Sequence, residues 1–391
     1  MKKNTLKLLA VAFLISTTAV VFQSCSDDDD DEIVVTNPGT GAASDPNNFK
    51  GEIKSGETVT LDPSKLYKLT GALAVKAGGT LVIPAGTRIE ASGGTSAYIT
   101  VEQDGKIMAN GTATNPIVMT SPNPTPGSWG GLVICGKAPI NKGTSATAEV
   151  GNATYGGTNA SDNSGVIKYV RIEYAGAIYQ ADKEFNGLSL FGVGNGTVID
   201  NVSLINGSDD GIEFFGGTVN VSNIISVGNE DDAFDWTEGW NGTATNIYTK
   251  RRASGVGNRG IEADNNSNNN DANPRSNPTI KNATFIGGTV GAENDAIKLR
   301  VGTHGILDNI VLSNWSTGIN VEHDASVSYF NGGGKITNIK FDTNVTTKAS
   351  LKSSTGAPVT ASATLFTENA SATGAGSGTA TPTWAAGWAG I

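Results

Sequence analysis

Two acidic segments, SDDGIEFFGG at 208–217 and NEDDAFDWTEGW at 229–240, repeat one pattern of residue types. Each segment places two adjacent carboxylates before a small residue and then alternates apolar and acidic side chains. Carboxylates in such a pattern can bind a cation, transfer a proton, or accept hydrogen bonds from the backbone of a turn. The pattern supplies six carboxylates, which are Asp209, Asp210, Glu213, Asp231, Asp232 and Asp235.

The acidic pattern belongs to a longer series of related segments. Six of them share a polar residue, then Gly or Ala, then a large apolar residue: NGLSLF (186), DGIEFF (210), DAFDWT (232), RGIEAD (259), DAIKLR (295) and TGINVE (317). Their first residues are 24, 22, 27, 36 and 22 positions apart. A second series, in phase with the first, consists of Asn201, Asn223, Asn246, Asn282, Asn309 and Asn338.

A period of about 22 residues with short alternating strands predicts a solenoid rather than a sandwich of hairpins. The leucine spacing of leucine-rich repeats is absent, so we predict an all-β fold in which each coil stacks on the last as a parallel β-helix. Three pairs of side chains are then expected to stack inside: Ile212 with Phe214, Phe234 with Trp236, and Ile297 with Leu299. The asparagines are expected at bends, because Asn tolerates the left-handed backbone region and stacked amides can bond one another.

The residues between the inward pairs should face outward as one column of side chains. Beside the six carboxylates, the following coils add Arg259, Glu262, Asp295, Lys298 and Arg300 to this face. Trp236 is expected in the core by its phase, whereas Trp240, in a Gly-rich turn, is the better platform for stacking on a sugar ring. The insertion at 262–278 would build a binding site or form a surface loop.

Three interpretations of the stacked carboxylates remain open. The first is a pair of solvated turns in which the first Asp of each pair caps backbone N–H groups. The second is a cation site, with Ca²⁺ favoured because it accepts six to eight oxygens in flexible geometry. The third is a catalytic site. A Ca²⁺ site would draw on Asp209, Asp210, Glu213, Asp231, Asp232 and Asp235. A catalytic site would draw on Asp210, Asp232, Asp235, Arg259 and Lys298, and a glycan-binding face on Trp240, Glu213, Glu262, Asp295 and Arg300.

The asparagine series resembles the asparagine ladder of right-handed parallel β-helix proteins of the pectate-lyase-like superfamily. GSWGGLVICGKAPI (127–140), VIKYVRIEYAG (166–176) and WAAGWAG (384–390) resemble surface lipoproteins of the Bacteroidota, a group without a settled activity. The Asp pairs, His304-Gly305 and Lys298-Leu-Arg300 resemble parts of the galacturonase pattern, although the basic pair precedes the histidine here. The resemblance implies the fold, and a polysaccharide lyase or glycoside hydrolase as the alternative to non-catalytic recognition.

The first residues are typical of an export signal. Lys2, Lys3 and Lys7 precede the apolar run LLAVAFLISTTAVVF, which is too short to span a membrane. The following FQSC resembles a lipobox, which implies cleavage before Cys25 and a lipid on that cysteine. The acidic run at 27–32 resembles the export tag of lipoproteins flipped to the cell surface. We therefore predict a signal peptide at 1–24, a flexible acidic tether at 25–50 and a single β-helix domain at 51–391.

The charge and cysteine content limit the partners. Without the three signal lysines, 24 basic residues face 37 acidic ones, a net charge of about −13. Such a surface disfavours nucleic acid as a ligand. If Cys25 is acylated, Cys135 is alone and is expected to be buried in a strand. The sequence thus predicts an outer-membrane, surface-exposed lipoprotein that recognises an extracellular polysaccharide or a surface protein along one face, with Ca²⁺ as a candidate cofactor.

Overall fold

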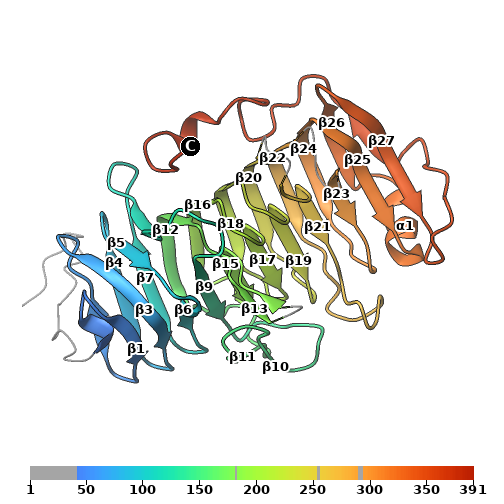
Figure 1. Ribbon diagram of the computed structural model, residues 1–391. Helices are drawn as coiled ribbons and strands as arrows, with labels where there is room; N and C mark the ends of the chain where they lie inside the picture. The colour runs from blue at the N-terminus through green and yellow to red at the C-terminus, as the bar shows by residue number, and fades with distance from the viewer. Residues whose placement is uncertain (1–41, 181–182, 253–255, 289–293) are drawn as a thin grey trace, which may run out of the picture. The chain divides into compact units, whose positions relative to one another are not determined.

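The computed structural model describes residues 42–180, 183–252, 256–288 and 294–391, and the structural statements below concern these residues. Within them, 24 strands form one continuous sheet in which every pairing is parallel and joins a strand to the corresponding strand of the next coil. The chain therefore folds as a parallel β-helix, as the period predicts (Figure 1). A single coil cannot bury its own apolar residues, so its stability depends on the coils on either side of it.

One series of strands forms the first face of the β-helix, and the acidic segments lie on it. Its members, each paired with the next, are β1 (Phe49–Ile53), β3 (Leu66–Val75), β6 (Gly94–Val101), β9 (Trp129–Cys135), β15 (Leu188–Phe191), β17 (Ile212–Phe215), β19 (Phe234–Thr237), β21 (Ile261–Ala263), β23 (Asp295–Leu299), β25 (Trp315–Glu322) and β27 (Val345–Lys352).

The remaining strands of the sheet form two further faces. They are β2 (Thr58–Thr60), β4 (Thr80–Pro84), β5 (Arg88–Ala91), β7 (Lys106–Asn110), β8 (Ile117–Thr120), β12 (Gly165–Glu173), β16 (Val198–Ile205), β18 (Asn220–Val227), β20 (Thr243–Lys250), β22 (Thr279–Ile286), β24 (Ile306–Ser313), β26 (Ile336–Phe341) and β28 (Phe366–Glu368). The first half of β12 pairs with β7 and its second half with β8. From β12 onward, one bent strand per coil therefore supplies both faces.

The bend in these strands lies at the predicted asparagine column. Tyr169 in β12 and then all six asparagines have φ between 50° and 59°, the left-handed region. Each amide nitrogen in the middle of the column donates to the amide oxygen of the preceding coil: Asn246 to Asn223 at 2.9 Å, Asn282 to Asn246 at 3.2 Å and Asn309 to Asn282 at 2.9 Å. The predicted ladder is confirmed for these four residues.

The ladder is interrupted at its two ends. Asn223 donates to Asp200 rather than to Asn201, and Asn338 donates to Asp308 rather than to Asn309. Asn338 in turn accepts a hydrogen bond from Asn369. The terminal asparagines therefore keep the bend without continuing the chain of amide bonds.

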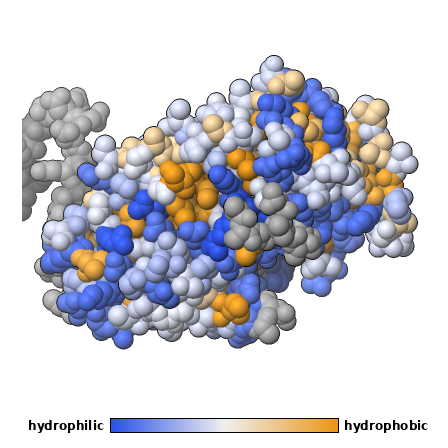
Figure 2. Space-filling view, turned by 45° about the horizontal axis from the view of Figure 1, so that its top comes forward, coloured by the Kyte–Doolittle hydropathy of each residue, from blue (hydrophilic) through white to orange (hydrophobic). Residues whose placement is uncertain are grey.

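The core lies between the three faces and contains the predicted apolar columns, whereas the outer face shown in Figure 2 is largely hydrophilic, with separate apolar patches. All six residues of the three predicted pairs are fully buried: Ile212, Phe214, Phe234, Trp236, Ile297 and Leu299. The parallel register aligns equivalent core positions of successive coils, so that Phe214 lies next to Trp236 and Ile261 next to Ile297. Alternation along each strand then sends the residue between two core positions outward.

Both ends of the chain add elements that the repeat does not predict. The 3-10 helix η1 (Ala42–Ser44) and the start of β1 lie within the predicted tether, and Phe49 is fully buried. The last residues of the segment 25–50 therefore belong to the β-helix, which corrects that boundary. The helix α1 (Asp324–Asn331) packs against β25 and β27. The signal peptide and Cys25 lie outside the described residues; Cys135 is buried and free, as predicted.

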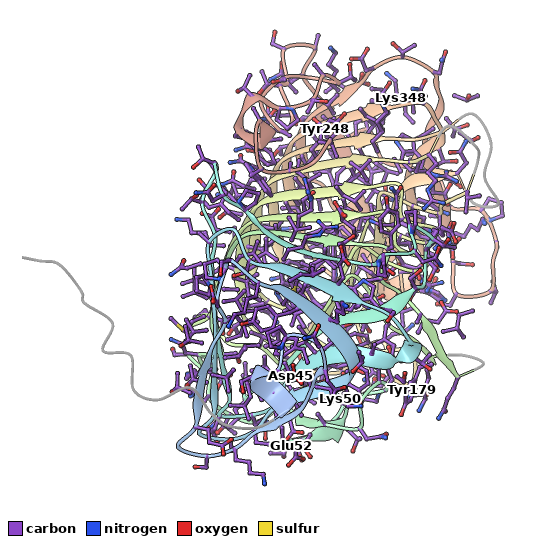
Figure 3. The ribbon with its side chains drawn as sticks, turned by 60° about the vertical axis from the view of Figure 1, so that its left-hand side comes forward. Asp45, Lys50, Glu52, Tyr179, Tyr248 and Lys348 are labelled. Carbon is purple, nitrogen blue, oxygen red and sulfur yellow. The ribbon has the colours of Figure 1, made fainter. Side chains whose placement is uncertain are left out.

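The C-terminal segment, residues 369–391, crosses the outside of the coils it follows, over β24, β22, β20 and β16 (Figure 1). Trp388 is fully buried against an apolar cluster that includes Ile225 and Tyr248, and it meets the Tyr169 ring edge to face. Tyr248 lies near this segment, and the labelled Asp45 and Lys348 mark opposite ends of the stack of coils (Figure 3). The segment contains the short 3-10 helix η2 (Thr383–Ala385).

Candidate functional site: a recess lined by carboxylates

The outward column on the first face is confirmed by the register of the strands. Ser189, Glu213, Asp235, Glu262, Lys298 and Asn320 occupy equivalent positions in six successive coils. Glu213 faces outward because its neighbours Ile212 and Phe214 point into the core. Stacking brings equivalent side chains to about 4.8 Å along the axis, so like charges in this column must be offset by their surroundings.

Three of the four paired aspartates that precede these strands are buried, so the interpretation as solvated turns is wrong for them. Asp209, Asp210 and Asp232 expose 9, 6 and 3% of their surface. The second Asp of each pair accepts a backbone hydrogen bond from the next coil: Asp210 Oδ1 from the N–H of Asp232 at 2.8 Å, and Asp232 Oδ1 from the N–H of Arg259 at 2.5 Å. Capping of backbone N–H groups is therefore found at the second Asp of each pair, not at the first as predicted, and it operates between coils at buried positions.

The structure brings the predicted carboxylates close enough together to share a cation. Three groups each offer oxygens that lie within 4.8 Å of one another: Asp209, Asp210 and Asp231; Asp210, Glu213 and Asp235; and Asp232, Asp235 and Glu262. Asp210 and Asp235 each belong to two groups, so the groups form one continuous cluster over three coils. These groups could hold a metal ion, because carboxylate oxygens are the ligands that hard divalent cations take.

The cluster opens into a recess of about 360 Å³ whose eight lining residues are all acidic. They are Glu149, Glu184, Asp209, Asp210, Asp231, Asp232, Asp235 and Glu262. A neighbouring recess of about 400 Å³ shares Glu184, Asp209 and Asp231 with it. Among the residues that the structure describes, no basic side chain lines the acidic recess.

Two of the lining residues were not predicted. Glu149 lies between β10 (Ala146–Thr147) and β11 (Thr154–Tyr155), and Glu184 ends the hairpin of β13 (Ile178–Gln180) and β14 (Lys183–Glu184). Both segments are insertions between coils, so the repeat pattern contains no signal for them. Their apolar residues Val150, Tyr155 and Phe185 pack in a second cluster on the outer side of β9 and β15, which places the hairpins beside the recess.

Burial and mutual repulsion raise the pKa of most of these carboxyl groups. Burial, then the charge of Asp209, holds the pKa of Asp210 well above its usual range, and burial has the same effect on Glu213 and Asp235. Burial raises the pKa of Asp232 to about 8. Burial also raises the pKa of Glu149 to about 7. A site that resists ionisation so strongly favours either bound protons or a bound cation.

Basic residues neutralise only one side of the cluster. Arg259, 4% exposed, contacts Asp232 at 3.2 Å and also pairs with Glu262. Arg300 pairs with Glu262 and, at 2.8 Å, with Asp264. The guanidinium of Arg259 thus supplies a counter-charge to the group of Asp232, Asp235 and Glu262. The group of Asp210, Glu213 and Asp235 has no ion pair with a basic side chain in the described part of the chain.

A buried side-chain amide whose oxygen has no partner lies beside the group of Asp210, Glu213 and Asp235. Asn186, 1% exposed, occupies the position of the column that precedes Asp210 and donates to Glu213 Oε2 at 2.8 Å. Its own Oδ1 has no hydrogen-bond partner among the described residues, and the same is true of Asp235 Oδ1. Unpaired buried oxygens are rare, because leaving one unpaired costs about 1–3 kcal/mol. One unpaired amide oxygen beside three carboxylates, one of which also has an unpaired oxygen, is a set of acceptors that a hard cation can take.

The prediction that Trp240 is an exposed platform for a sugar ring is wrong. Trp240 is fully buried, donates its indole N–H to Val219 O at 3.1 Å and stacks on the Phe214 ring at 3.9 Å. The Gly-rich turn folds this side chain back into the end of the coil, where Phe234 and Trp236 complete an apolar group around it. Trp240 therefore cannot stack on a sugar ring, whereas Trp236 lies in the core as predicted.

Of the other predicted residues on this face, Asp295, Lys298 and Arg300 lie outside the recess, on later coils. Asp295 stands one coil beyond Arg259 and accepts a hydrogen bond from Asn320 at 2.6 Å, and Lys298 lies 3.8 Å from Glu322. Of the insertion 262–278, only Glu262 lines the recess. The insertion is instead tied to the β-helix by Asn265, which is fully buried and accepts a hydrogen bond from Asn141 at 2.8 Å.

Comparison with known proteins agrees with the architecture. A family model described as "Pectate-lyase like beta helix domain" matches residues 51–389, so the chain belongs to this family of parallel β-helix proteins. No curated protein and no solved structure matches the chain. Among the described residues, no helix is long and apolar enough to cross a membrane.

Proposed function

We propose that the acidic recess binds a divalent cation, Ca²⁺, and through it an extracellular carbohydrate. A carbohydrate-related role is consistent with the family of the chain. The observation that carries the proposal is the convergence of oxygens from Asp210, Glu213 and Asp235 within 4.8 Å, beside the unpaired amide oxygen of Asn186. Ca²⁺ suits this set because it accepts carboxylate and amide oxygens in irregular geometry, whereas Mg²⁺ demands a regular octahedron.

Calorimetric titration of the purified protein with Ca²⁺ tests the ion. We expect one saturable site that Asp235→Asn removes, because this change deletes a charge shared by two groups while keeping the shape of the side chain. Asp271→Asn is the matched control, since Asp271 is an exposed carboxylate of the insertion, with a side chain that is 80% exposed. Equal titrations for wild type and Asp235→Asn would show that no ion binds at the cluster.

Cleavage of a polysaccharide is the second candidate. The observation that favours it is the pKa of Asp232, which burial raises to about 8, so that this carboxyl group keeps a proton at neutral pH and can act as a general acid. Asp210, Asp235, Arg259 and Lys298 would complete such a site. Incubation with a polysaccharide panel, followed for new reducing ends and for unsaturated products, tests this function. Activity that is lost in Asp232→Asn would favour cleavage over recognition.

We further propose that the protein is anchored to the outer membrane through a lipid on Cys25 and displayed at the cell surface. The support is the sequence FQSC after an apolar run, followed by the acidic residues 27–32. Cys25→Ala should release the protein from the membrane fraction. Replacing 27–31 with alanines should leave the lipid in place but abolish labelling of intact cells. Membrane fractionation that is unchanged in Cys25→Ala would refute the anchor.

A further inference from the structure

The two arginines that pair with carboxylates of the acidic recess are held by internal partners. Arg259 pairs with Asp232 and Glu262, and Arg300 pairs with Glu262 as well. Farther along the face, Lys298 lies 3.8 Å from Glu322, and beyond the hairpins Lys142 contacts Glu238 at 2.9 Å. A carboxylate on a ligand would have to displace one of these internal partners before it could pair with Arg259 or Arg300.

The two hairpins increase the negative charge at the mouth of the recess. Glu149 and Glu184 line it although neither belongs to the repeat, and Asp209 and Asp231 line it from the coils. One Ca²⁺ at Asp210, Glu213 and Asp235 carries two positive charges, whereas eight carboxylates line the recess. The carboxyl groups that line the recess therefore far outnumber the positive charges of one bound ion. Opposite charges attract a ligand and like charges reject it, and this rejection is a common source of specificity.

We infer that the recess takes uncharged saccharides, whose neighbouring hydroxyl groups coordinate the bound cation, and that it rejects uronates. The inference rests on the proposed function, since the hydroxyls need the ion. Hydroxyl oxygens are suitable Ca²⁺ ligands because they can replace the waters that complete six to eight coordination positions. The surrounding carboxylates then accept hydrogen bonds from the remaining hydroxyls. A uronate would instead bring its charge among Glu149, Glu184 and the aspartates.

Affinity electrophoresis of the purified protein in gels that contain one polysaccharide each, with Ca²⁺ or with a chelator, tests the inference. The panel consists of uncharged polymers (xylan, mannan, galactan, arabinan and β-glucan) and of uronates (galacturonan, alginate and glucuronan). We expect Ca²⁺-dependent retardation by at least one uncharged polymer and none by the uronates. Stronger Ca²⁺-dependent retardation by a uronate would overturn the inference and leave the proposed function standing.

A double variant tests the physical cause. Glu149→Gln with Glu184→Gln removes the two carboxylates that the hairpins add. The affinity for galacturonan should then rise about tenfold, which corresponds to about 1.4 kcal/mol, and should give a retardation that the wild type lacks. Glu52→Gln with Glu368→Gln is the matched control, because both residues are about half exposed, lie outside the recess and change the net charge equally. The control should bind galacturonan no better than wild type.

The outcomes separate the two proposals. An equal gain in both double variants would show that net charge, rather than the hairpins, excludes uronates, and would refute this inference alone. No gain in the Glu149 and Glu184 variant, with folding verified by circular dichroism, would refute it as well. Absence of Ca²⁺-dependent retardation by every polymer, together with a flat Ca²⁺ titration, would refute the proposed function and with it the inference.

Discussion

The stability of the protein should fall as the pH rises when no divalent cation is present. Burial raises the pKa of Asp232 from 3.8 to about 8, so between these values the folded protein binds a proton that the unfolded chain releases. The contribution is complete below pH 3.8 and is lost as the pH rises through about 8. A difference of about 4 pKa units corresponds to about 6 kcal/mol, a large part of the 5–15 kcal/mol that separates folded from unfolded domains.

This change can be measured as a shift of the melting temperature. For the 341 residues of the β-helix, an unfolding entropy of about 2.1 cal/mol/K per residue gives about 0.7 kcal/mol per degree, and about 6 kcal/mol then lowers Tm by about 8 °C. Ca²⁺ at a hundredfold excess over its Kd should stabilise by about 2.7 kcal/mol and restore about 4 °C. Mg²⁺ should restore less, because it keeps its waters.

Scanning calorimetry from pH 5 to 9, in chelator and in Ca²⁺, provides the assay; this range covers about 3 of the roughly 4 pKa units, which correspond to about 4 kcal/mol and to a fall in Tm of about 6 °C. Asp235→Asn is the informative variant, because it removes one of the charges that raise the pKa of Asp210 and also a proposed ligand of the ion. It should weaken the pH dependence without removing it, because burial still raises the pKa of Asp232, and it should abolish the response to Ca²⁺. A wild-type Tm that is constant across this pH range in chelator would refute the argument that the buried carboxyl groups bind protons only in the folded state.

Three further changes test other parts of the structure. Asn246→Ala should destabilise by about 1–3 kcal/mol, because it breaks ladder bonds on both sides and places alanine at φ 59°. Asn246→Gly loses the same bonds without the backbone strain, so equal urea midpoints for the two variants would contradict a contribution from strain. Trp388→Ala should cost about 3–5 kcal/mol and expose Ile225 and Tyr248 to a hydrophobic dye, whereas unchanged dye binding would mean that the C-terminal segment covers nothing. Trp240→Phe should lose about 1 kcal/mol with the bond to Val219 and leave retardation by polysaccharides unchanged, and a loss of retardation would restore Trp240 as a binding residue.

The repeat in the sequence was enough to predict the register of the β-helix. Residues such as Ile212 and Phe214 alternate with Glu213, and the same phase returns in each coil, so inward and outward columns follow from the period alone. The left-handed asparagines followed from the conformational tolerance of that residue. These features are local or repeat from coil to coil, which is why one sequence contains enough information to place them.

The parts of the recess that interrupt the repeat could not be predicted. Glu149 and Glu184 reach it through hairpins whose docking depends on the burial of Tyr155 and Phe185, and no local pattern states which face an insertion will cover. Trp240 was misplaced for a related reason: a Gly-rich turn can fold inward or outward, and the available space inside the coil decides. Burial of Asp210 likewise depends on these neighbours rather than on its own segment.

The course of the C-terminal segment has a consequence for how the chain acquires its structure. In a solenoid each repeat touches only its neighbours, so folding can stall with the last coils frayed. Here Ser203 donates to Ala389 O, a contact between residues 186 positions apart. Such a bond forms only after all intervening coils are in place. We therefore expect the C-terminal segment to dock late in folding and to join distant repeats into one cooperative unit. A chain truncated during synthesis would lack this segment and would expose Ile225 and Tyr248, and we expect proteases to degrade it.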